Sequence, residues 1–260
     1  MSALTVCARW VALALTVSCA ALLPLVRMLP PTARTAGHRL LARTALRGIG
    51  IRLDVEGRAS SGTGGVLVVA GHVSWADVLV LAAVVPGRFV ARADLVTWPL
   101  LGGVARRAGI IPIERARLRE LPGTVAQVRE YLGAGETVIA FPEGTTWCGQ
   151  AFGRFRPALF QAAIDADCLV LPVSIDYVTA SGERTTGPSF VGDEGIGVSI
   201  RRVLRSRGLR VEVVLGAPQV AGSSRRELAR RCDRHVRRRT DDGTRRILAQ
   251  LEGQRHQSAA

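Results

Sequence analysis

The sequence predicts an α/β protein whose mixed, mostly parallel sheet is flanked by helices and preceded by a membrane-associated helical segment. From residue 50 onward, short runs rich in β-branched residues alternate with segments of helical periodicity. The chain has 260 residues, 48% of them hydrophobic, which suits one large core. Residues 10–26 are almost uncharged and approach the lower limit of about 17 residues for a membrane-spanning helix.

These observations divide the chain into three parts. Residues 1–48 are predicted to form membrane-anchoring hydrophobic and basic helices, residues 49–240 the α/β domain, and residues 241–260 a C-terminal tail that frays. Arg39, Arg43 and Arg47 fall one turn apart, which predicts an amphipathic helix at the membrane interface. Its expected apolar side consists of Leu40, Leu41, Leu46 and Ile49.

The charges that flank the apolar stretch predict its orientation. Only Arg9 precedes it, whereas six Arg residues follow between positions 27 and 52, so the positive-inside bias places the rest of the chain in the cytoplasm. Two alternatives are a cleaved signal peptide and a lipoprotein signal ending at Cys19. Both would export the protein. The favoured location is the cell membrane, with the α/β domain on the cytoplasmic side.

The alternating pattern predicts each element of the α/β domain in turn. The expected strands cover residues 51–55, 66–70, 89–91, 110–113, 137–141, 169–175 and 210–215. The expected helices lie near residues 75–85, 98–107, 118–133, 156–166 and 223–239. Pro112 and Pro172 fall inside strand runs, so those strands should end there or lie at sheet edges. Residues 182–197 resemble an irregular insertion.

Charge and cysteine content restrict the classes of function. All 35 basic residues are Arg, which excludes a Schiff-base or phosphate-loop lysine. The net charge of +14 requires an anionic partner, such as a lipid surface, nucleic acid, an acidic carrier protein or a phosphorylated substrate. Arg clusters over residues 201–210 and 225–239 suit nucleic acid, but no reading element accompanies them and aromatic residues make up 5% of the chain. We therefore predict no nucleic-acid partner.

The five cysteines are scattered and lack the spacing of metal ligands, which indicates reduced thiols. We therefore expect neither a metal nor a cofactor. Cys148 is a weaker candidate for a nucleophile, because no His lies near it in the sequence.

The strongest catalytic candidates are His72 and Asp77. Ser74 suits a helix N-cap, which would put Asp77 at the third helical position. The two side chains can meet only if His72 precedes the helix and folds back over its first turn. An imidazole can then take a proton from an alcohol, while a carboxylate on its other nitrogen fixes the tautomer and stabilises the imidazolium. The hydroxyl would belong to the substrate.

Sequence order strengthens this prediction. The Gly-rich run over residues 64–71 delivers His72 to the end of a buried strand, where binding groups gather in α/β proteins. Four segments then resemble, in order, the sequence blocks of the lysophosphatidic acid acyltransferase family, and the resemblance covers roughly residues 50–220. These segments are HVSWAD at 72–77, GIIPIER at 109–115, FPEGT at 141–145 and VLPVSI at 170–175.

The resemblance implies an O-acyltransferase that moves a fatty acyl chain from acyl-CoA or acyl carrier protein to a lysophospholipid hydroxyl. The leading acceptor is 1-acylglycerol-3-phosphate, which gives phosphatidic acid. His72 is the implied base, Asp77 its orienting partner and Arg115 the phosphate ligand. Glu143 is expected to bind glycerol hydroxyls or to hold Arg115. The remaining implied substrate-binding residues are Gly144, Thr145 and Pro172, and Pro172 is equally expected to pack the core.

Two positions depart from the family pattern. Gly71 stands where the family usually has Asn, and Thr146 stands where it usually has Arg or Ser. The Thr145-Thr146 ending resembles relatives that acylate lyso-ornithine lipids, so another lysolipid stays open as the acceptor. Retention of Arg115 favours a phosphate-bearing acceptor.

Overall fold

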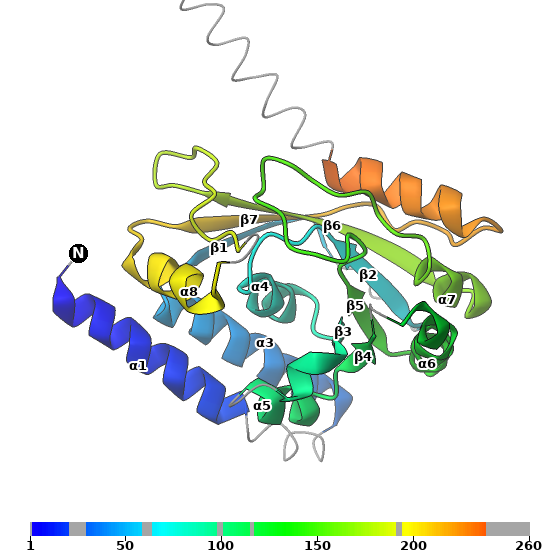
Figure 1. Cartoon of the computed structure of the whole chain (residues 1–260), viewed down its shortest axis with the longest axis horizontal. Helices are drawn as coiled ribbons and strands as arrows, with labels where there is room; N and C mark the ends of the chain where they lie inside the picture. Colours follow the sequence, from blue (N-terminus) through cyan, green and yellow to red (C-terminus); the bar gives the residue numbers. More distant parts are fainter. Residues whose placement is uncertain are drawn as a thin grey trace, which may run out of the picture.

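A seven-stranded sheet forms the centre of the protein, with helices on both of its faces (Figure 1). The computed structural model describes residues 2–20, 30–58, 64–97, 101–114, 117–190 and 194–237. The predicted tail over 241–260 and the second part of the apolar stretch, residues 21–26, lie outside these ranges. The predicted α/β class is confirmed.

The strand order is β1-β7-β6-β2-β5-β3-β4, and every pair is parallel except β6 with β7, which is antiparallel. The sheet is therefore mixed and mostly parallel, as predicted. The strands are β1 (Arg52–Glu56), β2 (Val66–Ala70), β3 (Arg88–Arg92), β4 (Ile111–Ile113), β5 (Thr137–Ala140), β6 (Leu169–Val178) and β7 (Arg210–Leu215).

The two prolines inside strands have different environments. Pro112 lies in β4 at the edge of the sheet, as predicted. Pro172 lies inside β6, a central strand that continues for six residues beyond it, so the prediction of an edge or a strand end is wrong there. The ladder is bulged at this point. The Pro172 carbonyl accepts the Gly216 N–H, and the next bridge pairs Val170 with Gln219. Two residue positions along β6 therefore lie opposite three positions along the segment after β7, which is a β-bulge.

The helices cover the two faces of the sheet unequally. On one face lie α1 (Ala3–Ala20), α3 (Pro31–Gly48), α4 (Asp77–Val84), α5 (Leu101–Ala108) and α8 (Ile196–Arg205). On the other lie α6 (Leu121–Gly133), α7 (Phe160–Asp165) and a helix over residues 225–237. Two 3-10 turns, η1 (Ala93–Thr97) and η2 (Leu118–Glu120), complete the described elements.

β2 is buried on both faces, as its continuous apolar run predicts. Val68 and Ala70 belong to the core beneath α3 and α4, whereas Leu67 and Val69 belong to the core beneath α6, α7 and the 225–237 helix. The loop that leaves β2 is therefore fixed from two sides.

Helix α8 was missed by the sequence prediction, which placed no helix there. Gly197 and the β-branched Val198 and Ile200 disfavour a helix locally. Val203 and Leu204 are fully buried against the sheet, so tertiary packing outweighs propensity in this segment.

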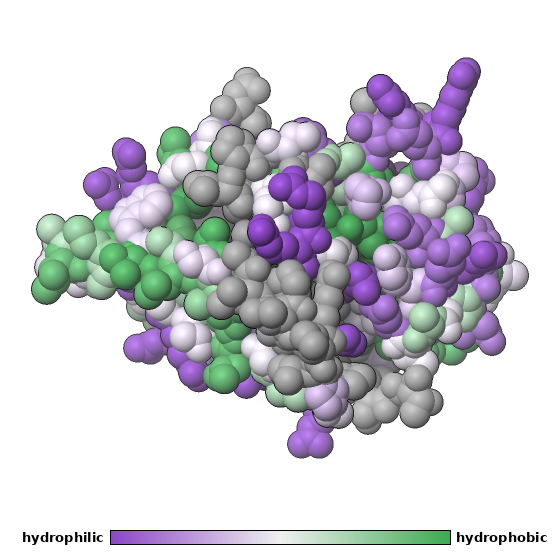
Figure 2. Space-filling view, turned by 90° about the horizontal axis from the view of Figure 1, so that it is seen from below, coloured by the Kyte–Doolittle hydropathy of each residue, from purple (hydrophilic) through white to green (hydrophobic). Residues whose placement is uncertain are grey.

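The N-terminal helices pack on the domain and also expose apolar surface. Leu46 and Ile49 are buried in the core beneath α4, so this part of the predicted membrane-facing stripe is protein interior, while Leu40 is 66% exposed. α1 exposes Leu4, Val11 and Leu15. In the view of Figure 2, hydrophobic side chains gather at the left, over α1.

Candidate active site

The carboxyl ends of two neighbouring parallel strands bring the candidate residues together. His72 follows β2 and the FPEGT segment follows β5, and these strands pair directly. The backbone N–H of His72 donates to Oε2 of Glu143 at 3.0 Å, and the His72 carbonyl accepts the Trp147 N–H at 2.7 Å. Both main-chain groups of His72 are therefore held by the loop after β5.

His72 and Asp77 meet as their proposed roles require. Nδ1 of His72 lies 2.9 Å from Oδ2 of Asp77, which also accepts the backbone N–H groups of Val73 and Ser74 at 2.8 and 2.9 Å. The helix begins at Asp77 with Ala76 as its N-cap residue, so the prediction of Ser74 as N-cap is wrong. The turn before the helix is held from both sides: the Asp77 carboxylate accepts the Val73 and Ser74 N–H groups, and Ser74 Oγ accepts the Ala76 N–H at 3.2 Å.

The imidazole ring of His72 is stacked on an aromatic side chain and is partly exposed. Its ring stacks on Phe141, with ring centroids 4.1 Å apart and 17° between the planes, and 18% of the side chain is exposed. A carboxylate only accepts hydrogen bonds, so Nδ1 donates to Asp77, and in the neutral form of the ring Nε2 carries the lone pair. Within the described residues, no hydrogen bond engages Nε2. This nitrogen can take a proton from a bound alcohol.

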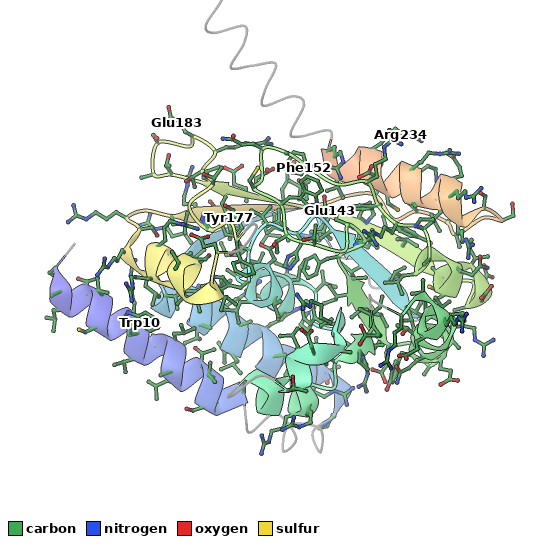
Figure 3. The ribbon with its side chains drawn as sticks, viewed as in Figure 1. Trp10, Glu143, Phe152, Tyr177, Glu183 and Arg234 are labelled. Atoms are coloured by element: carbon green, nitrogen blue, oxygen red, sulfur yellow. The ribbon has the colours of Figure 1, made fainter. Side chains whose placement is uncertain are left out.

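Tyr177 supports Asp77 from the other side. This residue lies in β6, 100 positions away in the chain, and its hydroxyl donates to Oδ1 of Asp77 at 2.7 Å. Burial and the neighbouring carboxylate raise the pKa of the Tyr177 hydroxyl well above its usual value, so it stays protonated as a donor. Sequence reasoning missed Tyr177, because nothing along the chain links it to Asp77. Figure 3 shows it near the centre of the molecule.

Replacing Tyr177 by Phe should lower the free energy of unfolding by about 1–3 kcal/mol, because Oδ1 of a fully buried carboxylate loses its donor. Denaturant unfolding measures the change. The matched control is Tyr131→Phe, which alters the other tyrosine of the chain, on α6. Equal stability of the two variants would contradict a supporting role for the Tyr177 hydroxyl.

Glu143 is a buried link rather than an open ligand. Its side chain is 0% exposed; Oε2 accepts from His72, and Oε1 lies 3.1 Å from Nη2 of Arg237 in the 225–237 helix. Burial raises the pKa of Glu143, whereas the His72 N–H and the Arg237 guanidinium oppose that rise. Glycerol hydroxyls or Arg115 are its expected partners, and Arg115 lies outside the described residues; within them, Glu143 is bound by His72 and Arg237.

The other predicted substrate-binding residues are spread over the site and beyond it. Gly144 has φ +78°, which favours glycine, and a Cβ there would lie 3.3 Å from Nε of Arg156. Thr145 is exposed beside it. Pro172 is buried in β6, in register with Val69 and against Gly216. Arg115 lies outside the described residues.

Metal binding and a thiol nucleophile are two other kinds of chemistry that such a loop can carry. In the described part of the chain, no group of three or more His, Cys, Asp or Glu side chains is placed to hold a metal ion. Cys148 lies in the same loop, where its Sγ accepts the Ala151 N–H at 3.3 Å, and backbone N–H groups lower its pKa. Among the described residues, no hydrogen bond joins this thiol to the imidazole of His72.

Comparisons with known proteins find similarity to acyltransferases. Residues 52–176 match the family model described as Acyltransferase. The chain is 36% identical over 183 residues to the 1-acyl-sn-glycerol-3-phosphate acyltransferase of Neisseria gonorrhoeae, covering 70% of this chain and 71% of that protein. It is 35% identical over 176 residues to the lyso-ornithine lipid O-acyltransferase of Pseudomonas aeruginosa, covering 66% of each.

The fold is also similar to a solved structure. The 1-acyl-sn-glycerophosphate acyltransferase of Thermotoga maritima aligns with a TM-score of 0.66 at 20% identity, covering 92% of this chain and 94% of that one. Family model, relatives and fold agree, and the chain belongs to the glycerolipid acyltransferase family that contains the 1-acyl-sn-glycerol-3-phosphate acyltransferases.

Proposed function

We propose that the protein transfers a fatty acyl chain from acyl-CoA or acyl carrier protein to the free hydroxyl of 1-acylglycerol-3-phosphate, producing phosphatidic acid. The observation that supports this proposal best is the His72–Asp77 pair, in which Nδ1 is bound at 2.9 Å, Nε2 makes no hydrogen bond within the described residues, and the side chain is partly exposed. That arrangement suits a base acting on a substrate hydroxyl.

The proposed reaction needs no acylated form of the protein. Nε2 of His72 takes the proton of the acceptor hydroxyl as the oxygen attacks the thioester carbonyl. The C–S bond then breaks, and the thiolate leaves with the proton that the imidazolium returns. Asp77 stabilises the imidazolium between these two proton transfers.

The direct test is to incubate the purified protein with labelled acyl-CoA and, separately, acyl carrier protein, each with a panel of lysolipids. Mass spectrometry identifies the acylated products. We expect phosphatidic acid from 1-acylglycerol-3-phosphate in wild-type protein and none with His72→Ala. Failure to acylate any lysolipid with either donor would refute the proposal.

A second candidate acceptor is lyso-ornithine lipid. Thr146 occupies the position where the family usually has Arg or Ser. Its hydroxyl donates to the Phe190 carbonyl, so its proton is used in a hydrogen bond within the protein and not for a substrate. The identity to a lyso-ornithine lipid acyltransferase, 35%, nearly equals the 36% to a 1-acylglycerol-3-phosphate enzyme. The same lysolipid panel distinguishes the two acceptors.

Arg115 is proposed as the phosphate ligand, because a guanidinium binds phosphate through two parallel hydrogen bonds. Arg115→Ala should raise the KM for 1-acylglycerol-3-phosphate by about 10- to 100-fold and the KM for the donor much less. Steady-state kinetics with each substrate varied in turn measures both values. The control is Arg117→Ala, which removes an exposed Arg paired with Glu120. Equal effects on the two KM values would exclude phosphate binding by Arg115.

We also propose that the protein acts at the cytoplasmic face of the cell membrane. α1 is long and apolar enough to cross a bilayer and is unburied along its 18 residues. Nη1 of Arg9, however, donates to the carbonyls of Leu204 and Ser206 at the end of α8, at 3.0 and 2.7 Å. This contact ties α1 along the domain and favours a helix lying in the interface with Trp10 at its exposed side.

A further inference from the structure

Arg237 connects the 225–237 helix to the loop that carries Glu143. Its Nε donates to Oδ1 of Asp233 at 2.7 Å, its Nη2 lies 3.1 Å from Oε1 of Glu143, and Nη2 also donates to the Gly153 carbonyl. The guanidinium carbon lies 4.8 Å from the ring centroid of Phe152. The Arg237 side chain is 19% exposed, so these contacts fix its position in a mostly buried setting. Figure 3 shows Phe152 and Glu143 near the left end of this helix.

Glu143 passes this connection to the proposed base. One carboxylate oxygen binds Arg237 and the other accepts the backbone N–H of His72 at 3.0 Å. Asp77 holds the imidazole of His72, whereas Glu143 holds its main chain. The helix that supplies Arg237 lies beyond residues 52–176, the segment that matches the family model.

We propose that Arg237 is a positioning residue of the acyl-transfer site: it orients Glu143, which in turn fixes the backbone from which His72 projects. The inference rests on the proposed roles of His72 and Glu143. Small displacements of a catalytic group cost large factors in rate, so a residue two contacts away from the base can control turnover. The 225–237 helix is thereby part of the site.

Charge gives this connection a measurable signature. The charged and titratable groups around Glu143 are His72 from the loop after β2, Arg237 and Asp233 from the 225–237 helix, and Arg156, which lies against Gly144. Burial raises the pKa of Glu143, and Arg237 opposes that rise. Loss of the guanidinium should therefore raise this pKa further. Activity that needs the ionised carboxylate would then appear at higher pH.

A double-mutant cycle of Arg237→Met and Glu143→Gln tests the inference. Methionine keeps apolar volume beside Phe152 and removes the charge. With acyl-CoA as donor, Arg237→Met should lower kcat by about 10- to 100-fold with a smaller change in KM. In the Glu143→Gln background, the same substitution should change kcat by no more than about twofold. The acidic limb of the pH profile should move to higher pH in Arg237→Met alone.

Controls separate positioning from simple loss of fold. Arg230→Met removes an exposed Arg paired with Glu227 on the same helix and should leave kcat unchanged. If Arg237→Met does not fold, two other substitutions replace it in the cycle. Arg237→Lys keeps the charge, and Asp233→Asn removes the second carboxylate that binds Arg237. Arg237→Lys should keep the acidic limb of the pH profile at its wild-type position. Asp233→Asn should lower kcat only where Glu143 is present.

Equal loss of kcat in both backgrounds, or an unchanged pH profile, would overturn the inference, since each result means that Arg237 acts independently of Glu143. His72→Ala in the same assay keeps the two proposals apart. An inactive His72→Ala beside a fully active Arg237→Met defeats only the role of Arg237. An active His72→Ala defeats the proposed function itself.

Discussion

Replacement of His72 by Ala is expected to lower kcat by about 10²- to 10⁴-fold or more, the usual contribution of a general base. Nε2 is the nitrogen left to act on the substrate, because Nδ1 is bound to Asp77 and the ring is stacked on Phe141. Without the imidazole, the acceptor hydroxyl must attack the thioester while it still holds its proton. The measurement is kcat with saturating acyl-CoA and 1-acylglycerol-3-phosphate.

The His72→Ala result must be separated from unfolding and from loss of lipid binding. Thermal denaturation and binding of the acceptor to the variant provide these checks. His38→Ala is the matched control, because it removes a histidine from α3 and should leave kcat unchanged. Near-normal turnover of a folded, lipid-binding His72→Ala protein would remove His72 from the mechanism.

Replacement of Asp77 by Asn is expected to lower kcat by about 10²- to 10⁴-fold while the protein still folds. The Asn side-chain oxygen can still accept the hydrogen bonds that Oδ2 accepts, and its amide can face the Tyr177 hydroxyl. What it removes is the negative charge beside the imidazolium formed during proton transfer. The expected signature is a fall in kcat with little change in KM for either substrate.

The test for Asp77 is non-additivity. If Asp77 acts through the imidazole, the His72→Ala, Asp77→Asn double variant should be no slower than His72→Ala alone. Ser174→Ala is a suitable control, since this buried polar residue lies in the same strand as Tyr177 and donates to Asp176 rather than to Asp77. A kcat for Asp77→Asn close to the wild-type value, or losses that multiply in the double variant, would contradict the assignment.

Much of the fold could be predicted because burial in this protein follows short, local patterns. β2 is a continuous apolar run, and it lies between two cores at the predicted residues. The prediction was wrong where distant partners decide the structure. Pro172 stays in a central strand because Gly216 and Gln219 bulge opposite it, and α8 forms because Val203 and Leu204 reach the sheet. Gly216 and Gln219 lie far from Pro172 in the sequence.

The site divides in the same way. Residues close together in the chain were identified from spacing and order, as with His72 and Asp77. The residues that support them come from elsewhere: Tyr177 lies 100 positions from Asp77, and Arg237 lies 94 from Glu143. Tyrosine in a strand and arginine in an Arg-rich helix carry no local signal of such contacts.

The sequence by itself determined the α/β class, the strands and the order of the four segments that identify the family, because these depend on periodicity and on neighbouring residues. The tertiary structure alone decided which buried groups hold the base, where the apolar faces of α1 and α3 are used, and that Glu143 is enclosed between His72 and Arg237. Hydrogen bonds and burial act across space, so partners far apart in the chain are determined only when the sheet brings them together.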